Sequence, residues 1–311
     1  MIGRSLADLL LSPTALGTTT ATRPALFEAA RRAAGPEGLV EDIVHEGDLR
    51  EPAQLSALFA SPGDPELRPT LLFLHGKGGS GAEWRRDVVR ALRLGCNVLV
   101  PELRGHAPST GPRITYGHFE KTDLAILVET ATERFGVDPA RLAIDGCSMG
   151  SHIALQLASG PAPVRALWLQ APFSSLVQMA VQYIQRATSL PRWLVEAPAR
   201  FSVLQVERAS GLALAELDPV EAASLVTCPA FVVHGEGDAL VPIDYSARVY
   251  AALGGPKEMW RAPRCGHCHH PDEPQAVRGR EYRERWTAFF RKHLFEKHRR
   301  ANASDPRLER R

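Results

Sequence analysis

Residues 141–158 read RLAIDGCSMGSHIALQLA, where a short apolar run leads into Gly146-Cys-Ser-Met-Gly150 and a helical pattern follows. In a G-x-S-x-G pentapeptide between a strand and a helix, the serine lies on a sharp turn with its hydroxyl above the sheet. Glycines flank such a turn because a side chain there would crowd the approach of helix to strand. We therefore expect Ser148 to be a nucleophile and the backbone N–H of Met149 to face a developing oxyanion. An ordinary strand-to-helix turn is the alternative, and the rest of the chain must distinguish the two.

The composition is typical of a globular protein with a large core. The chain has 311 residues, of which 44% are apolar and 23% charged, and its formal net charge is +2. A charge so close to balance favours neither nucleic acid nor a membrane surface as a partner. No apolar run approaches the about 18 residues of a membrane span, and Asp8 interrupts the N-terminal run Leu6–Leu11. Five cysteines are too few for a disulfide framework and favour a reducing compartment. We expect a soluble, cytoplasmic protein that neither binds nucleic acid nor spans a membrane.

Strand and helix patterns alternate along most of the chain. Thr70–Leu74 is wholly apolar, as expected of a strand buried on both faces of a parallel sheet. Before it, residues 41–48 and 53–60 are typical of an antiparallel pair. Further strands are predicted at 97–101, 141–145, 164–170, 230–234 and 258–262, and helices at about 82–92, 119–135, 148–159, 245–253 and 273–294. This order predicts an α/β fold with a mostly parallel central sheet and helices on both of its faces.

The same patterns predict the domain organisation. Residues 1–40 are expected to form an N-terminal extension packed on the core, with a short helix at 24–34. Residues 41–295 form the main domain, but the strand and helix alternation breaks between about 172 and 227, where an amphipathic pattern predicts a small helical cap insertion. Residues 296–311 form a basic, solvated tail.

A serine hydroxyl becomes a strong nucleophile when a histidine accepts its proton and a carboxylate orients that histidine. The strand at 230–234 runs into Gly235-Glu-Gly-Asp238, so Asp238 follows the carboxyl end of the strand, where open α/β sheets carry their sites. The loop after the next strand contains His267. We expect Ser148, Asp238 and His267 to act together. The competing candidates are Glu236 for the acid, and His269 and His270 for the base.

Several further stretches stand in the order found in one known family. They are His75-Gly76, Pro101–Ser109, the turn around Ser148, His234–Asp238 and Gly266-His267. With these motifs, residues 41–294 resemble the α/β-hydrolase superfamily, and the lead-in Gly136–Arg141 resembles its esterase-like and peptidase-like members. The resemblance implies Ser148 as nucleophile, Asp238 as orienting acid and His267 as general base. It also implies an oxyanion hole made by the backbone N–H groups of Lys77 and Met149.

The reaction implied by this resemblance is hydrolysis of a carboxylic ester through an acyl-enzyme, without a cofactor or a metal. The substrate would be a small acyl ester, or a short peptide-like molecule if the chain is a peptidase or amidase of the same fold. In the cap, Met179, Tyr183, Trp193 and Phe201 suggest a mainly apolar substrate pocket. Alternatively, these four residues pack the cap onto the core.

A glycine loop permits a function of another class. Gly76-Lys-Gly-Gly-Ser-Gly81 fits G-x-G-x-x-G between a strand and a helix, and Glu102 ends the next strand, so the local pattern is that of a dinucleotide-dependent oxidoreductase. Against this alternative, His75 stands where a small or apolar residue usually precedes the first glycine. The alternative also leaves the order of Ser148, Asp238 and His267 unexplained.

The cysteines permit two further alternatives. Cys265-Gly-His-Cys268 has the spacing of a redox motif, and together with His269 and His270 it could hold zinc. A redox pair needs its first thiolate at a helix N-terminus, and here a helix could begin only after Pro271. Cys147 would need glycines at positions 145 and 149 to be the nucleophile, so we expect it to be a small residue under the turn.

Overall fold

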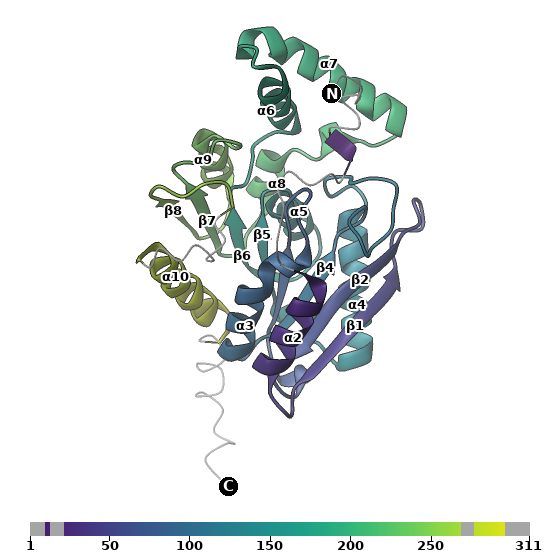
Figure 1. The fold of residues 1–311 in the computed structure, drawn as a ribbon, viewed down its shortest axis with the longest axis vertical. Coiled ribbons are helices and arrows are strands. Elements are labelled where there is room, and N and C mark those ends of the chain that lie inside the picture. Colours follow the sequence, from purple (N-terminus) through teal and green to yellow (C-terminus); the bar gives the residue numbers. More distant parts are fainter. Residues whose placement is uncertain (1–9, 13–21, 269–276, 296–311) are drawn as a thin grey trace.

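The computed structural model of the protein describes residues 10–12, 22–268 and 277–295 (Figure 1). Its centre is an eight-stranded sheet in the order β1-β2-β4-β3-β5-β6-β7-β8. β2 is antiparallel to both β1 and β4, and all other neighbours are parallel, which confirms the predicted mostly parallel sheet and its antiparallel pair. The strands are β1 (Leu39–Glu46), β2 (Gln54–Ser61), β3 (Thr70–Leu74), β4 (Asn97–Glu102), β5 (Leu142–Cys147), β6 (Val164–Gln170), β7 (Ala230–Gly235) and β8 (Lys257–Ala262).

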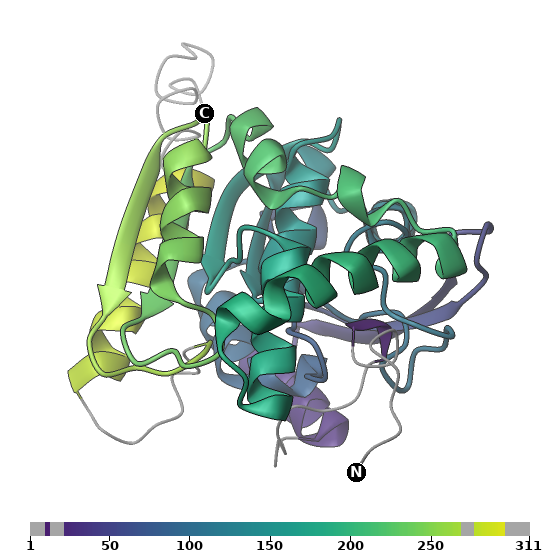
Figure 2. The same ribbon diagram turned by 90° about the horizontal axis from the view of Figure 1, so that it is seen from above.

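Helices cover both faces of this sheet, as Figures 1 and 2 show. One face carries α2 (Arg23–Ala34), α3 (Arg85–Leu94) and α10 (Val277–Leu294). The other face carries α4 (Glu120–Phe135), α5 (Met149–Ala158), α8 (Pro219–Leu225) and α9 (Ile243–Ala252). The predicted α/β architecture is therefore confirmed.

The apolar run of β3 is explained by these two layers. Successive side chains of a strand point to opposite faces of the sheet. Leu71 and Phe73 pack among the side chains of α2, α3 and α10, whereas Leu72 and Leu74 pack among those of α4, α5, α8 and α9. All four are fully buried, so β3 has no polar face to present to water.

Some element boundaries differ from the sequence prediction. The helix predicted at 82–92 opens with a 3-10 turn, Gly81–Trp84, before α3 begins, and Gly95 in a left-handed conformation ends it. The helix predicted at 24–34 is confirmed as α2, where the Thr22 side chain accepts a hydrogen bond from the first turn. The first residues of the last predicted helix, 273–276, and the tail at 296–311 lie outside the described residues.

The segment for which we expect a cap contains α6 (Leu176–Thr188), α7 (Arg192–Ser210), a 3-10 turn at Leu214–Glu216 and then α8. α6 and α7 pack against each other at one end of the molecule (Figure 1). α6 reaches the loops that follow β3 and β7, since the Lys77 ammonium lies 5.0 Å from the Tyr183 ring centre and Arg186 donates to the Ala239 carbonyl at 3.4 Å. Both loops lie at the carboxyl edge of the sheet. None of the helices that the structure describes is long and apolar enough to cross a bilayer.

Candidate active site

The turn around Ser148 lies between β5 and α5 and has a strained backbone. Ser148 has φ 52° and ψ −110°, in the positive-φ half of conformational space that non-glycine residues rarely enter. A Cβ on Gly146 would lie 2.6 Å from the Gly150 carbonyl oxygen, and a Cβ on Gly150 would lie 2.0 Å from that of Leu74. Both flanking positions therefore exclude any side chain, as the pentapeptide predicts.

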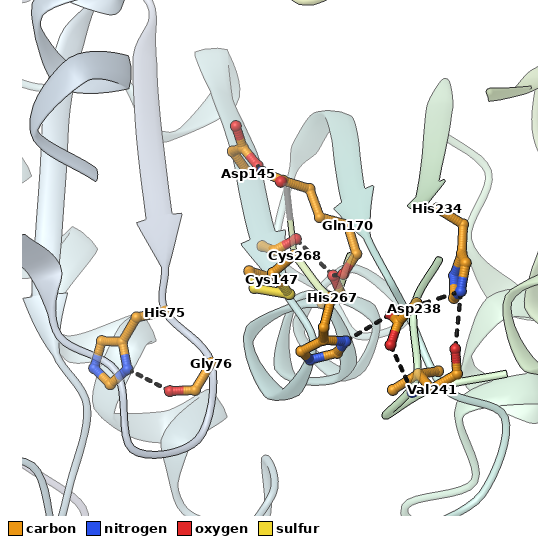
Figure 3. Close-up of a disulfide and its surroundings, with 12 residues drawn as sticks. His75, Gly76, Asp145, Cys147, Gln170, His234, Asp238, Val241, His267 and Cys268 are labelled. Atoms are coloured by element: carbon orange, nitrogen blue, oxygen red, sulfur yellow. Dashed lines mark hydrogen bonds and ion pairs between the residues drawn. A yellow bond between two sulfur atoms is a disulfide. The ribbon is translucent and has the colours of Figure 1, made fainter. Parts of the chain in front are cut away.

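The loops after β7 and β8 bring Asp238 and His267 together (Figure 3). His267 Nδ1 donates to Asp238 Oδ2 at 2.7 Å, and the backbone N–H groups of Leu240 and Val241 both donate to Asp238 Oδ1 at 2.8 Å. Burial is the largest single influence and would raise the pKa of Asp238, but the hydrogen bond and charge of His267, together with the backbone hydrogen bonds of Val241 and Leu240, outweigh it and lower the pKa. The carboxylate thus stays ionised and fixes the His267 proton on Nδ1, which leaves Nε2 as the basic nitrogen.

The side chains of Ser148 and His267 are both largely shielded from solvent. Ser148 is 7% exposed, and the His267 side chain is 24% exposed. Within the part of the chain that the structure describes, no hydrogen bond joins the Ser148 hydroxyl to His267. Hydrogen bonds between a nucleophile and its general base are often long before substrate binds and shorten in the complex. We therefore expect the bond between Ser148 and His267 to form when substrate is bound.

The loop after β3 passes beside the turn of Ser148. A Cβ on Gly76 would lie 3.6 Å from Ser148 Cβ, which puts the backbone of Gly76 and Lys77 next to the nucleophile position. His75 braces this loop, because its Nδ1 donates to the Gly76 carbonyl at 2.8 Å and its Nε2 accepts from the Leu103 N–H at 3.0 Å. Burial lowers the pKa of His75 to about 3, so the ring is neutral and can hold both bonds.

His106 is a second brace that the sequence analysis does not identify. Its Nε2 accepts from the Gly78 N–H at 3.1 Å, and its ring packs edge-on against His75 with 4.6 Å between centroids. His106 lies in the Pro101–Ser109 stretch, so the sequence motif includes this residue but does not indicate that it contacts Gly78. Two neutral histidines thus hold the loop that we expect to supply the Lys77 N–H.

The alternative acid and bases differ in their placement. Glu236 is exposed at the surface, whereas the Asp238 side chain is fully buried against His267. Asp238 also lies 3.7 Å from a second buried histidine, His234, whose Nε2 contacts the Val241 carbonyl. His269 and His270 lie outside the described residues.

The geometry does not support the oxidoreductase alternative. Glu102 would have to face a ribose, yet it is 3% exposed and its carboxylate accepts the Gly81 N–H at 2.9 Å. Its other close neighbour is His75 Nε2 at 3.8 Å. The acid thus ties the glycine loop to β4 and leaves no open carboxylate beside it.

Glu102→Gln is expected to flatten the pH dependence of the free energy of unfolding. Burial raises the pKa of Glu102 from 4.5 to about 7 in the folded protein. Between these values the folded state binds more protons than the unfolded chain, so the stability contributed by this carboxyl is present below the lower value and is lost as the pH rises through the higher one. Glutamine keeps an oxygen for the Gly81 N–H but does not titrate. Urea unfolding of both proteins between about pH 4 and pH 8 measures the difference, and parallel profiles would contradict the expectation.

The four residues suggested for a substrate pocket fall into two groups. Met179 and Tyr183 on α6 are 2% and 7% exposed, and Tyr183 lies beside Lys77. Trp193 and Phe201 on α7 are 76% and 60% exposed, so neither packs the cap onto the core. The sequence pattern does not distinguish the two faces of α7, because its buried face carries only the small residues Val195, Ala199, Val203 and Val206.

The cysteines form a disulfide that the sequence analysis does not predict. Cys147 is bonded to Cys268, with 5.9 Å between their Cα atoms (Figure 3). The expectation that Cys147 is only a small residue under the turn is therefore wrong, and the cysteine count no longer supports a reducing compartment. Cys268 pairs with a residue 121 positions away, because β5 and β8 end at the same edge of the sheet. Cys265, its neighbour in the redox motif, remains a buried thiol that contacts the Pro263 carbonyl.

Zinc binding at the same motif finds no support in the described residues, which contain no group of three or more possible metal ligands. Cys268 is already bonded to Cys147, so its sulfur is not available as a thiolate ligand. The remaining ligands of that hypothesis, His269 and His270, fall outside the described ranges.

The fold and the sequence together define the class of the protein. A family model described as alpha/beta hydrolase fold matches residues 69–219. The sheet order, the turn at Ser148 and this match show that the chain has the α/β-hydrolase fold.

Individual relatives and structures agree with this class. An uncharacterised protein of Mycobacterium tuberculosis is 31% identical over 214 residues, which cover 68% of this chain and 66% of that protein. A lysophosphatidylserine lipase of Danio rerio is 27% identical over 70% of this chain and 55% of its own. The matches thus span less than two thirds of these relatives.

Solved structures show the same fold. An esterase of Pyrococcus furiosus superposes with a TM-score of 0.67 at 19% identity, covering 91% of this chain and 98% of its own. An acetyl xylan esterase from Paenibacillus sp. R4 has a TM-score of 0.63 at 18% identity, covering 93% and 98%. At such identities the likeness concerns the fold.

Proposed function

We propose that the protein is a serine hydrolase that cleaves carboxylic esters with Ser148, Asp238 and His267. The observation that carries the proposal is the 2.7 Å hydrogen bond from His267 Nδ1 to the buried Asp238 carboxylate, in the loops beside the Ser148 turn. A histidine held in this tautomer by an ionised acid is what a serine nucleophile requires. We include residues 41–295 in the catalytic domain and residues of about 172–227 in its cap.

The proposed reaction proceeds through an acyl-enzyme. Ser148 Oγ attacks the ester carbonyl while His267 Nε2 accepts the hydroxyl proton, and Asp238 stabilises the imidazolium that forms. The backbone N–H groups of Met149 and Lys77 stabilise the oxyanion. His267 then donates the proton to the leaving alcohol, and a water molecule, activated by the same nitrogen, releases the acid. All of these steps use protein groups and water alone.

Two observations favour an ester over a peptide. The names of similar proteins and structures include an esterase, an acetyl xylan esterase and a lipase, which act on oxygen esters. The ring of Tyr183 lies beside Lys77 and offers apolar surface at this loop, which suits an acyl or alcohol group of a small molecule. A peptidase or amidase of the same fold is the second candidate, because its chemistry needs the same three side chains.

A panel of p-nitrophenyl esters of rising acyl length, assayed beside aminoacyl anilides, tests the proposal. We expect Ser148-dependent turnover of the esters and a preference for some chain length, because apolar surface beside the nucleophile can cover an acyl chain of limited length only. Faster turnover of the anilides would support the peptidase instead. Absence of turnover and of fluorophosphonate labelling at Ser148 would contradict both.

A further inference from the structure

The Cys147–Cys268 disulfide joins the neighbours of the proposed nucleophile and the proposed general base. Cys147 directly precedes Ser148, and Cys268 directly follows His267. In Figure 3 the disulfide lies on one side of the His267 ring and Asp238 on the other. We propose that Cys147 and Cys268 are positioning residues whose disulfide holds the His267 imidazole within reach of the Ser148 hydroxyl. This inference rests on the proposed function.

The loop that carries His267 has a backbone that needs support. Arg264 has φ 56° and Cys268 has φ 44°, so two non-glycine residues of this short loop adopt left-handed conformations. Such conformations cost about 1 kcal/mol or more each and persist only where the surroundings hold them. A loop with two of them has no strong local preference for the geometry that it shows here.

Two different links hold this loop. The Gly237 N–H donates to the Cys265 carbonyl at 2.8 Å, and a Cβ on Gly235 would lie 2.3 Å from the Gly266 carbonyl oxygen, so the first half of the loop packs tightly on the turn of Asp238. The disulfide links the other end of the loop to the Ser148 turn. The hydrogen bond from His267 to Asp238 aims the ring, and the disulfide sets its distance from the serine.

The disulfide also lies beside the loop after β3. A Cβ on Gly76 would lie 3.6 Å from Cys147 Sγ and equally far from Ser148 Cβ. The bond therefore lies where three parts of the proposed site meet, namely the serine turn, the histidine loop and the loop of Lys77. A change at this point moves the general base relative to the nucleophile and to the oxyanion donors at once.

Burial makes this disulfide a lasting constraint. Cys147 is 4% exposed and Cys268 is 8% exposed, so a thiol reagent reaches the sulfurs only when the loop opens. Redox sensors, in contrast, carry accessible sulfurs. The buried position of the disulfide is that of a permanent link between the Ser148 turn and the His267 loop.

A double-mutant cycle on the full chain tests the inference. Cys147→Ser and Cys268→Ser each remove the same bond, so we expect each to lower kcat for the best ester by about 10- to 100-fold with little change in KM, since a displacement of about 1 Å can cost that much. The double variant should lose no more than either single variant, because the bond is lost once. Cys265→Ser is the matched control in the same loop and should keep the wild-type kcat.

Two measurements separate positioning from mere stabilisation. Circular dichroism and thermal unfolding show whether each variant is folded at the assay temperature. The KM for the same ester should stay close to the wild-type value while kcat falls, because the change concerns the distance between His267 and Ser148 and not the binding of substrate. If a variant does not fold, the folded wild type is reduced with dithiothreitol, which becomes a cyclic disulfide as the two thiols form, and its kcat is compared before and after reoxidation.

The outcomes distinguish this inference from the proposed function. Folded variants with wild-type kcat and a lowered Tm would overturn the positioning role and leave the ester hydrolase standing. Losses that add up in the double variant would also overturn it, as would an intact mass showing all five cysteines as thiols after purification in air. A wild-type protein without Ser148-dependent turnover would overturn the proposed function and, with it, this inference.

Discussion

Ser148→Ala is expected to lower kcat for ester hydrolysis by up to about 10⁶-fold. The variant lacks the oxygen that forms the acyl-enzyme, and neither His267 nor Asp238 can replace it. What remains is the contribution of the oxyanion donors and of substrate binding, which is about 10³- to 10⁴-fold over water in serine enzymes. Initial rates on the best p-nitrophenyl ester, at enzyme concentrations high enough to detect this remaining activity, measure the loss.

The matched control for this experiment is Ser159→Ala. Ser159 ends the same helix, and its hydroxyl donates to the Gln156 carbonyl at 3.1 Å. It should keep wild-type kcat and wild-type labelling by a fluorophosphonate, whereas Ser148→Ala should show no labelling. Full activity in Ser148→Ala would contradict the proposed nucleophile.

Asp238→Asn is expected to lower kcat by about 10⁴-fold with little change in fold. Asp238 Oδ1 accepts two backbone N–H groups, and Oδ2 accepts from His267 Nδ1. An asparagine would keep its oxygen toward the two backbone donors and so turn its NH₂ group toward His267. The imidazole would then carry its proton on Nε2 and could not accept one from Ser148. Steady-state kinetics give the loss, and the circular dichroism spectrum shows that the fold is kept.

Glu236→Gln provides the control for the acid, since the two positions share one turn. Glu236 is exposed, so neutralising it should change kcat by less than about threefold, as for most surface substitutions. A larger loss of kcat in Glu236→Gln than in Asp238→Asn would assign the orienting carboxylate to Glu236 in place of Asp238.

The sequence by itself determined the sheet and the placement of the main loops. The apolar residues of Thr70–Leu74 and the repeated strand and helix patterns predict parallel strands buried on both faces, and the structure confirms both. The glycines at 146 and 150 predict a turn without room for side chains, and the short distances from a Cβ at either position to the neighbouring backbone confirm it. These features could be predicted because the periodicity of a strand and the steric demands of a turn are local properties of the chain.

Only the tertiary structure decided the contacts between distant segments. The pairing of Cys147 with Cys268, the support of Gly78 by His106, and the outward position of Trp193 depend on which strand ends and helix faces meet. Asp238 and Glu236 are carboxylates of the same turn, and it is the loop after β8, through His267, that contacts Asp238 and not Glu236. Local sequence patterns carry no information on these contacts, because sheet order and helix packing bring together residues that can be more than a hundred positions apart.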